Sequence, residues 1–279
     1  MQKRLCVATY VSGSEYQEFI PVYIYSILCS YPDYFVFIFC GEKIKQNVRK
    51  SLDILEQIGN FKIIENHLPA HSGKLKKGVA AACKRWLLYI PEFSNYDFLY
   101  IGDVDIFIIP DQTSLLDQHL THCQTLQLDY SNVRRRASAK RISGLHFVKI
   151  EPYFKKMLPI IDKYSTMILS DQSNYEVIDD ECMLFDMINE SMLGLCPQAK
   201  DVEHIDPRMP SFRPYHGIHL AVFRDLIVKK RRVISYDFQK NMKTLHYMID
   251  EPLFKKIEMN FDGRLIKRIF NRIHNFSFN

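Results

Sequence analysis

A chain of 279 residues, 47% hydrophobic and 25% charged, can bury a large core and has the composition of a globular protein, not of a disordered one. No run approaches the roughly 18 uninterrupted apolar residues of a membrane span. The net charge of +5 is concentrated at 134–141 and from Lys255 onward, in patches that attract anionic partners or are simply solvated. The seven cysteines have no C-x-x-C or zinc spacing, so we expect reduced core thiols and a cytoplasmic protein.

Strands and helices alternate through the first hundred residues. Apolar runs predict strands at Leu5–Val11, Tyr34–Phe39 and Phe61–Ile64. Helical spacing of apolar residues connects them, over Phe19–Leu28 and Ile44–Ile58. This alternation predicts an α/β fold with a mostly parallel central sheet and helices on both faces.

Two aspartates interrupt the next apolar run, Phe98–Ile109, which we expect to be one buried strand. Because side chains alternate along extended backbone, Asp103 and Asp105 are expected to project from one face and Val104 from the other, into the protein. Two adjacent carboxylates suit Mn or Mg, and such a cation usually brings a phosphate with it. The alternative is a solvated pair that caps a turn and holds no metal.

Ligands of parallel sheets bind beyond the carboxyl ends of the strands. Thr9 and Tyr10, near the end of the first strand, are therefore expected to face the same crevice as Asp103. The helix that leads into the acidic strand carries Lys84 and Arg85, two cations that could approach the same ligand.

After Pro110 the pattern is less regular. It predicts strands at Leu126–Tyr130 and Ile142–Val148, with the arginine-rich stretch between them. Gly144 lies inside the second of these strands, where glycine marks either the close approach of a ligand or a bulge.

An acidic cluster opens a predicted helix over Cys182–Ile188. Asp179, Asp180 and Glu181 would be favoured there by the exposed N–H groups of the helix start, so structure alone could explain them. The same carboxylates would also suit a catalytic base or a ligand for an acceptor hydroxyl.

Two histidines, His216 and His219, flank a glycine on a predicted loop. Either could complete the coordination sphere of a metal held by the aspartates, because imidazole is an accepted ligand for Mn-type ions. A lone histidine is more often structural than ligating.

The C-terminal stretch predicts a basic amphipathic helix. Such a helix can lie on an anionic membrane surface or dock on its own domain. Its apolar face carries Leu265, Ile266, Ile269, Phe270 and Ile273, and its basic residues are Arg264, Lys267, Arg268 and Arg272.

Over most of residues 4–220 these features resemble the nucleotide-sugar-dependent glycosyltransferases of the GT-A fold, a Rossmann-like architecture. The likeness is to bacterial capsule and lipopolysaccharide transferases, including the family-8 type. In that family the D-x-D carboxylates hold Mn or Mg against the donor diphosphate, which the resemblance assigns to Asp103 and Asp105. It also implies donor contacts for Arg85 and its neighbour Lys84.

The resemblance implies roles for the remaining motifs as well. The strand containing Gly144 resembles the one that lines the donor sugar. The cluster Asp179-Asp180-Glu181 resembles either the acidic motif of inverting members or the D-Q-D of retaining ones, but its glutamine is absent, so the stereochemistry stays open. His216-Gly217 resembles the late metal-ligand histidine. The Lys-Pro-Trp that often follows is missing, which leaves the choice between His216 and His219 open.

The implied activity is transfer from a nucleotide-sugar, with a UDP-sugar as the expected donor, to a glycan or lipid-linked acceptor in bacterial surface polysaccharide synthesis. We expect one catalytic domain at 1–250, with a nucleotide-binding half at 1–110 and an acceptor half at 111–250. A helical tail at 251–279 would place the protein peripherally at the inner membrane leaflet. No nucleic acid partner is expected.

Three rival interpretations remain. Phosphatases with an aspartyl nucleophile also use an apolar D-x-D, but usually on the first strand of the domain. A sugar-phosphate nucleotidyltransferase would need a glycine-rich basic loop near the N-terminus, and Ser12-Gly13-Ser14 substitutes poorly for one. A sugar- or membrane-binding module could also have kept the fold without turnover.

Overall fold

The computed structural model describes residues 3–68, 77–133, 142–169, 179–195, 216–224 and 236–276. The arginine-rich stretch at 134–141 lies outside these ranges. No helix of the described ranges combines the length and hydrophobicity needed to cross a bilayer.

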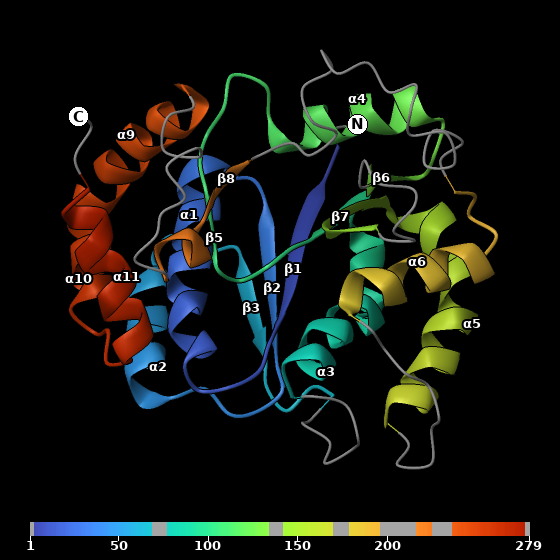
Figure 1. The fold of residues 1–279 in the computed structure, drawn as a ribbon, viewed down its shortest axis with the longest axis horizontal. Coiled ribbons are helices and arrows are strands. Elements are labelled where there is room, and N and C mark those ends of the chain that lie inside the picture. The colour runs from blue at the N-terminus through green and yellow to red at the C-terminus, as the bar shows by residue number, and fades with distance from the viewer. Residues whose placement is uncertain are drawn as a thin grey trace. The chain divides into compact units, whose positions relative to one another are not determined.

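The strands form a mixed sheet of six in the order β3-β2-β1-β4-β7-β6, and β5 pairs with β8 in a second sheet of two (Figure 1). Pairing is parallel between β1 and β4 and between β2 and β3, whereas β7 runs antiparallel to both β4 and β6. The prediction of an α/β fold with a mostly parallel central sheet is confirmed, with helices around that sheet. The strands are β1 (Leu5–Val11), β2 (Phe35–Cys40), β3 (Phe61–Ile64), β4 (Phe98–Ile101), β5 (Ile106–Ile108), β6 (Tyr130–Val133), β7 (Ile142–Lys149) and β8 (Gly217–His219).

The chain divides into two compact units, each built from discontinuous segments. Unit 1 contains Met1–Tyr10, Leu68–Asp103 and Thr113–Pro214, and unit 2 contains Val11–His67, Val104–Gln112 and Tyr215–Asn279. This division differs from the predicted halves at 1–110 and 111–250, because the chain passes from one unit to the other between the two aspartates.

Unit 1 surrounds β1, β4, β7 and β6 with helices. Its core is aromatic: Phe98 on β4 stacks on Phe147 of β7 at 5.5 Å between ring centroids. Helix α6 contacts α3, α5 and β7. Its first residue, Asp180, is bound by Arg85 and Trp86 in the segment that follows α3. The helical elements are α3 (Lys77–Lys84), η2 (Arg85–Leu87), η3 (Pro91–Asn95), α4 (Leu115–Leu126), α5 (Ile150–Leu169) and α6 (Asp180–Glu190).

Unit 2 packs the C-terminal helices against the first two helices of the chain. Phe254 lies 5.1 Å from Tyr25 and 5.3 Å from Phe270, between ring centroids. The Tyr25 hydroxyl donates to the Met248 carbonyl at 2.7 Å, and the Ser51 hydroxyl to the Ile257 carbonyl at 3.4 Å. The segment predicted as a tail is thus part of the core of this unit. The helical elements are η1 (Tyr16–Glu18), α1 (Phe19–Ser30), α2 (Gln46–Leu55), η6 (Leu220–Phe223), α9 (Tyr236–Asp250), α10 (Pro252–Glu258) and α11 (Arg264–His274).

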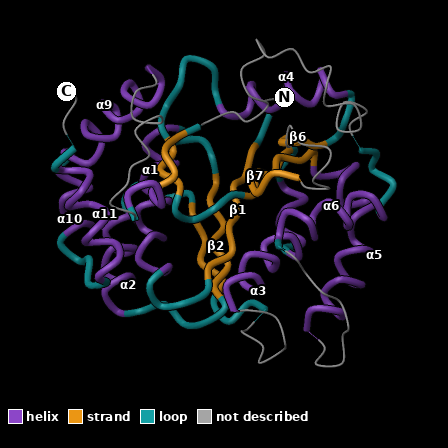
Figure 2. The backbone as a smooth tube through the Cα atoms, viewed as in Figure 1, coloured by secondary structure: helices purple, strands orange, loops and turns teal. Residues whose placement is uncertain are grey.

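Two sequence expectations are wrong. The apolar run Phe98–Ile109 is not one strand, because β4 ends at Ile101 and residues 102–105 turn before β5 begins at Ile106. Figure 2 distinguishes the strands, in orange, from the loops, in teal. The strand predicted at Leu126–Tyr130 instead begins at Tyr130, as β6, because α4 continues to Leu126 and is closed by Gln127 in the left-handed conformation, with φ 55°. Val104 does point inward, and only 5% of it is exposed.

Candidate functional site

The carboxyl ends of β1 and β4 lie side by side in unit 1. Ala8 pairs with Ile101, and the buried hydroxyl of Thr9 donates to the carbonyl of Gly102 at 2.8 Å. Asp103 follows directly, so it leaves the sheet at the edge where ligands of α/β sheets bind.

A buried arginine forms ion pairs with two carboxylates at this edge. Arg85, at the first position of η2, is 7% exposed and donates through one terminal nitrogen to Asp103 and through the other to Asp180. Its guanidinium lies 4.6 Å from the ring centroid of Trp86, and the Trp86 indole N–H donates to the Asp180 carbonyl at 2.8 Å. Two carboxylates therefore share one guanidinium.

The other predicted donor-binding residues of unit 1 lie close by. Lys84 is 3% exposed and its ammonium lies 5.6 Å from the ring centroid of Tyr10. The Tyr10 hydroxyl donates to the Leu68 carbonyl at 2.8 Å. Gly144 lies within β7, and its surroundings fall outside the described part of the chain.

The three acidic residues at the start of α6 have different positions. Asp179 caps the helix, because its carboxylate accepts from the Cys182 N–H at 2.9 Å. Asp180 reaches Arg85, and Glu181 is buried with 7% exposed. Of the three, Asp180 is the one that the structure joins to Asp103 through a shared partner.

Asp105 belongs to a second cluster, in unit 2. It is 5% exposed, pairs with Arg224, and lies 3.7 Å from Nε2 of His219. The Arg224 guanidinium also lies 5.1 Å from the ring centroid of Tyr16. No motif surrounds Arg224 in the sequence, so it could not be singled out there.

The pairing of β5 with β8 brings the histidine segment to Asp105. A Cβ at Gly217 would overlap the Phe107 carbonyl oxygen, so only glycine allows this close approach. The Ile109 N–H donates to the His216 carbonyl at 2.7 Å, and the Leu220 N–H to the Asp105 carbonyl at 2.8 Å. The glycine between the two histidines is therefore required by packing.

The imidazole rings of the two histidines differ in their surroundings. Burial lowers the pKa of His216 to about 3, so its imidazole is neutral, as a metal ligand must be. His219 accepts a hydrogen bond at Nδ1 from the Ala221 N–H at 3.2 Å. This bond keeps the proton of the neutral ring on Nε2, the atom that faces Asp105, whereas a ligating histidine usually donates through its outer nitrogen. His219 is thus the histidine placed beside Asp105, and His216 is the one with a buried neutral ring, so the choice between them as metal ligand stays open.

The donor chemistry suits a divalent cation, because carboxylate oxygens and a neutral imidazole are present. Each D-x-D carboxylate is, however, paired with an arginine of its own unit, Arg85 or Arg224. Among the described residues no three potential metal ligands are grouped together. Occupation by a cation would thus require the arginines to release these carboxylates.

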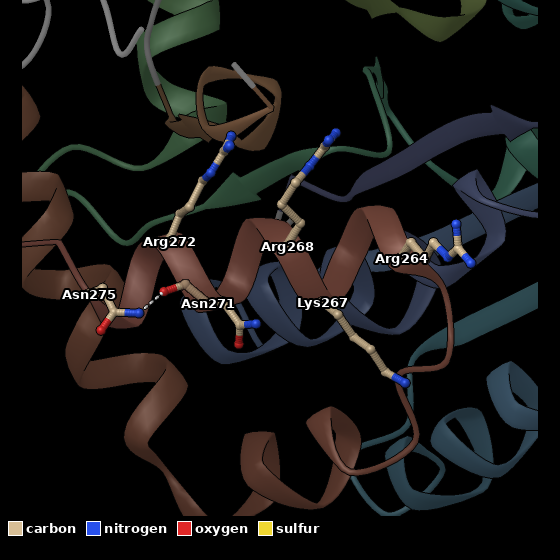
Figure 3. Close-up of a pocket in the computed structure, with 6 residues that line it drawn as sticks. All are labelled: Arg264, Lys267, Arg268, Asn271, Arg272 and Asn275. Carbon is tan, nitrogen blue, oxygen red and sulfur yellow. Dashed lines mark hydrogen bonds between the residues drawn. The ribbon is translucent and has the colours of Figure 1, made fainter. Parts of the chain in front are cut away.

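A separate hollow of about 480 Å³ lies on the outer surface of α11 (Figure 3). The carboxylates, arginines and histidines of the two clusters described above do not line this hollow. One of its lining residues, Arg272, also contacts the turn that carries Arg224. Its lining residues are Arg264, Lys267, Arg268, Asn271, Arg272 and Asn275.

No family model and no curated protein matches the sequence. The fold is similar to that of a galactosyltransferase, LgtC, in complex with donor and acceptor sugar analogues, at 13% identity over 64% of this chain and 69% of that chain, with a TM-score of 0.43. The glycosyltransferase GlyE of Streptococcus pneumoniae is 12% identical over 98% of this chain and 64% of that chain, with a TM-score of 0.46. Core-mannan synthase A of Aspergillus fumigatus, in a Mn/GDP form, is 8% identical over 67% of this chain and 70% of that chain, with a TM-score of 0.43.

All three proteins are of the class named by the sequence resemblance. With each TM-score below 0.5, the function proposed below rests on the residues of this chain.

Proposed function

We propose that this chain is a metal-dependent glycosyltransferase that moves a sugar from a UDP-sugar to a glycan or lipid-linked acceptor in bacterial surface polysaccharide synthesis. One observation carries the proposal: Arg85 holds Asp103 and Asp180 together beside the end of β4. This edge of an α/β sheet is where nucleotides bind, and carboxylate oxygens are the ligands preferred by the cation that accompanies a diphosphate.

Transfer requires neutralisation of the negative charge that develops on the departing diphosphate. Mn or Mg, when bound, supplies this as a Lewis acid. Asp103 and Asp105 would hold the cation, and His216 or His219 would be a further ligand. Lys84 and Arg85 add fixed positive charge on the donor side of the sheet edge.

The acceptor hydroxyl must lose a proton during transfer. Asp180 is the proposed base of an inverting reaction, with Glu181 beside it, because Arg85 fixes the orientation of the Asp180 carboxylate. Asp179 is committed to capping α6. In a retaining reaction the same carboxylates would orient the substrate instead.

A thermal-shift screen of UDP-, GDP- and CMP-sugars, with and without Mn, tests the proposal. A UDP-sugar with Mn at a hundredfold excess over its Kd should raise the Tm by about 5 °C, because it binds only the folded state. The shift should disappear in Asp103→Asn and persist in Asp162→Asn, which alters an exposed carboxylate on α5. Absence of any shift for every nucleotide-sugar would reject the proposal.

A second observation, the basic outer face of α11, supports a proposal of peripheral membrane attachment, with the cytoplasmic leaflet as the expected surface. We propose that the basic outer face of α11 docks electrostatically on anionic lipid, because its apolar face is already buried in unit 2: Ile266, Ile269 and Ile273 are each 0% exposed. Each Lys or Arg near such a surface contributes about 1 kcal/mol, and the attraction is screened by salt.

Vesicle sedimentation measures this attachment. Binding to vesicles with 30 mol% phosphatidylglycerol should fall strongly as NaCl is raised, and vesicles of phosphatidylcholine alone should not bind. A triple variant of α11 should lose binding, whereas removal of three exposed lysines elsewhere should not. The first set is R264Q, K267Q and R268Q, and the control set is K50Q, K155Q and K243Q. Equal binding by the two sets would reject attachment through α11.

A further inference from the structure

We infer that Arg224 acts as a gate on Asp105: its guanidinium occupies the carboxylate and must be displaced before a cation can bind. The inference rests on the proposed role of Asp105 as a metal ligand and adds a regulation of that site. It assigns a role to Arg224 and to the contact that holds it, neither of which the sequence motifs indicate.

The first support is the burial of the pair. The Asp105 side chain is 7% exposed and that of Arg224 27%. A carboxylate so well removed from water requires a counter-charge. Within the described ranges its ion-pair partners are Arg224 and, at 3.7 Å, His219. Arg224 is therefore the permanent cation of the pair, because arginine keeps its charge at all ordinary pH values.

The second support is the way in which the turn carrying Arg224 is held. Arg272 of α11 donates from one terminal nitrogen to the carbonyl of Phe223 at 2.6 Å and to that of Arg224 at 2.7 Å. Figure 3 shows its side chain extending away from the helix. On the other side, the Arg224 guanidinium lies 5.1 Å from the Tyr16 ring centroid. The position of Arg224 over Asp105 is thus set by contacts outside the ion pair itself.

The consequence is competition for one carboxylate. Arg224 pairs with Oδ2 of Asp105, whereas Oδ1 faces His219. A divalent cation and a guanidinium repel each other, so a cation binds this carboxylate best when Arg224 has released it. The measured Kd of the metal equals the intrinsic Kd divided by the fraction of molecules in which Arg224 has released Asp105. Removal of the guanidinium should therefore tighten metal binding. A charged hydrogen bond of this kind corresponds to about a tenfold effect on an equilibrium.

Calorimetric titration of the full chain with Mn²⁺ alone tests the gate, with no nucleotide and no activity measurement. Arg224→Met should lower the Kd for Mn²⁺ about tenfold, since it removes the competing charge. Arg49→Met is the matched control, because Arg49 also pairs with a carboxylate of unit 2, Glu65 at 2.6 Å, and should leave the Kd unchanged. Asp105→Asn should weaken binding whether or not Arg224 is present.

A milder variant covers the case in which Arg224→Met does not fold. Arg272→Met keeps both charges of the gate but removes the two hydrogen bonds to its turn, and it should lower the Kd about two- to threefold.

The outcomes separate the gate from the metal site. Loss of Mn²⁺ binding in Asp105→Asn, together with an unchanged or weaker Kd in the variants of Arg224 and Arg272, would overturn the gate and leave the proposed metal site intact. Equal binding, or none, by the wild type, Asp105→Asn and Arg224→Met would overturn both.

Discussion

Arg85 and Asp180, 95 residues apart in the sequence, are joined by an ion pair inside unit 1. The same guanidinium reaches Asp103, so the end of β4 and the start of α6 are held by one side chain. The Arg85 side chain is 9% exposed, whereas those of Asp103 and Asp180 are 30% and 17% exposed. The Arg85 guanidinium is therefore buried inside the protein, whereas the two carboxylates lie nearer to solvent, where a ligand could contact them.

Replacement of Arg85 by methionine should destabilise the protein by about 2–4 kcal/mol, because it leaves two partly buried carboxylates without their shared partner. Urea unfolding measures the loss. Arg49→Met removes an arginine whose side chain is 48% exposed from a pair with Glu65, and it should cost less than about 1 kcal/mol. Similar losses in the two variants would show that the Arg85 bridge is not a special feature of the fold.

The glycine between the two histidines gives a second prediction. Gly217→Ala should cost about 2–3 kcal/mol or more, because the new methyl group would force β8 away from the Phe107 carbonyl. Gly263→Ala is a milder comparison, since a Cβ there would first meet the flexible side chain of Glu18, at 3.3 Å. Urea unfolding of both variants measures whether Gly217→Ala loses more stability than Gly263→Ala. An unchanged stability in Gly217→Ala would mean that β5 and β8 do not pair as described.

The third prediction concerns pH. Complete burial lowers the pKa of His146 to about 3, so the folded protein does not bind a proton there that the unfolded chain binds near pH 6.5. Unfolding thus takes up a proton in this window, and stability should fall as the pH falls from about 6.5 to 3, by up to about 1.4 kcal/mol per pH unit for this histidine.

His146→Phe keeps an aromatic ring beside Tyr130 and Tyr153 but cannot be protonated. It loses the contact of 3.1 Å with the Tyr153 hydroxyl, so its stability at pH 7 is expected to be lower. The slope of unfolding free energy against pH between 4 and 6 should nevertheless be shallower than in the wild type. Parallel slopes would mean that His146 is protonated in the folded state.

The sequence allowed the first half of the fold to be predicted, because strands such as Leu5–Val11 and Phe61–Ile64 are short, mostly apolar segments between glycines or polar turns. The turn between Asp103 and Asp105 could not be predicted in this way. Both flanking segments are apolar, and their assignment to different sheets depends on the distant strands β7 and β8. Helix α4 could not be predicted for another reason. His119 and His122 are polar residues, so they interrupt the apolar pattern of the helix, yet they are buried, with 0% and 9% exposed.

The candidate site was only partly visible in the sequence. Asp103, Asp105 and Arg85 stand next to a strong apolar pattern, and Asp179 matches a known helix-capping preference. The arginine bridge to Asp180 and the pairing of Arg224 with Asp105 join positions 95 and 119 residues apart. Ion pairs over such separations leave no periodic signal in a single sequence, so they follow from the fold alone.

The C-terminal helix gives the last prediction. Phe270 is 1% exposed and lies 5.3 Å from Phe254 and 5.1 Å from Phe261, between ring centroids. Phe270→Ala should therefore cost about 3–5 kcal/mol, because it removes a large side chain and leaves a cavity in unit 2. Lys267→Ala, on the outer face of the same helix, should change stability by no more than about 0.5 kcal/mol. Urea unfolding distinguishes the two interpretations of α11: a small loss for Phe270→Ala would mean that the helix is a detachable tail whose apolar face is free to enter a membrane.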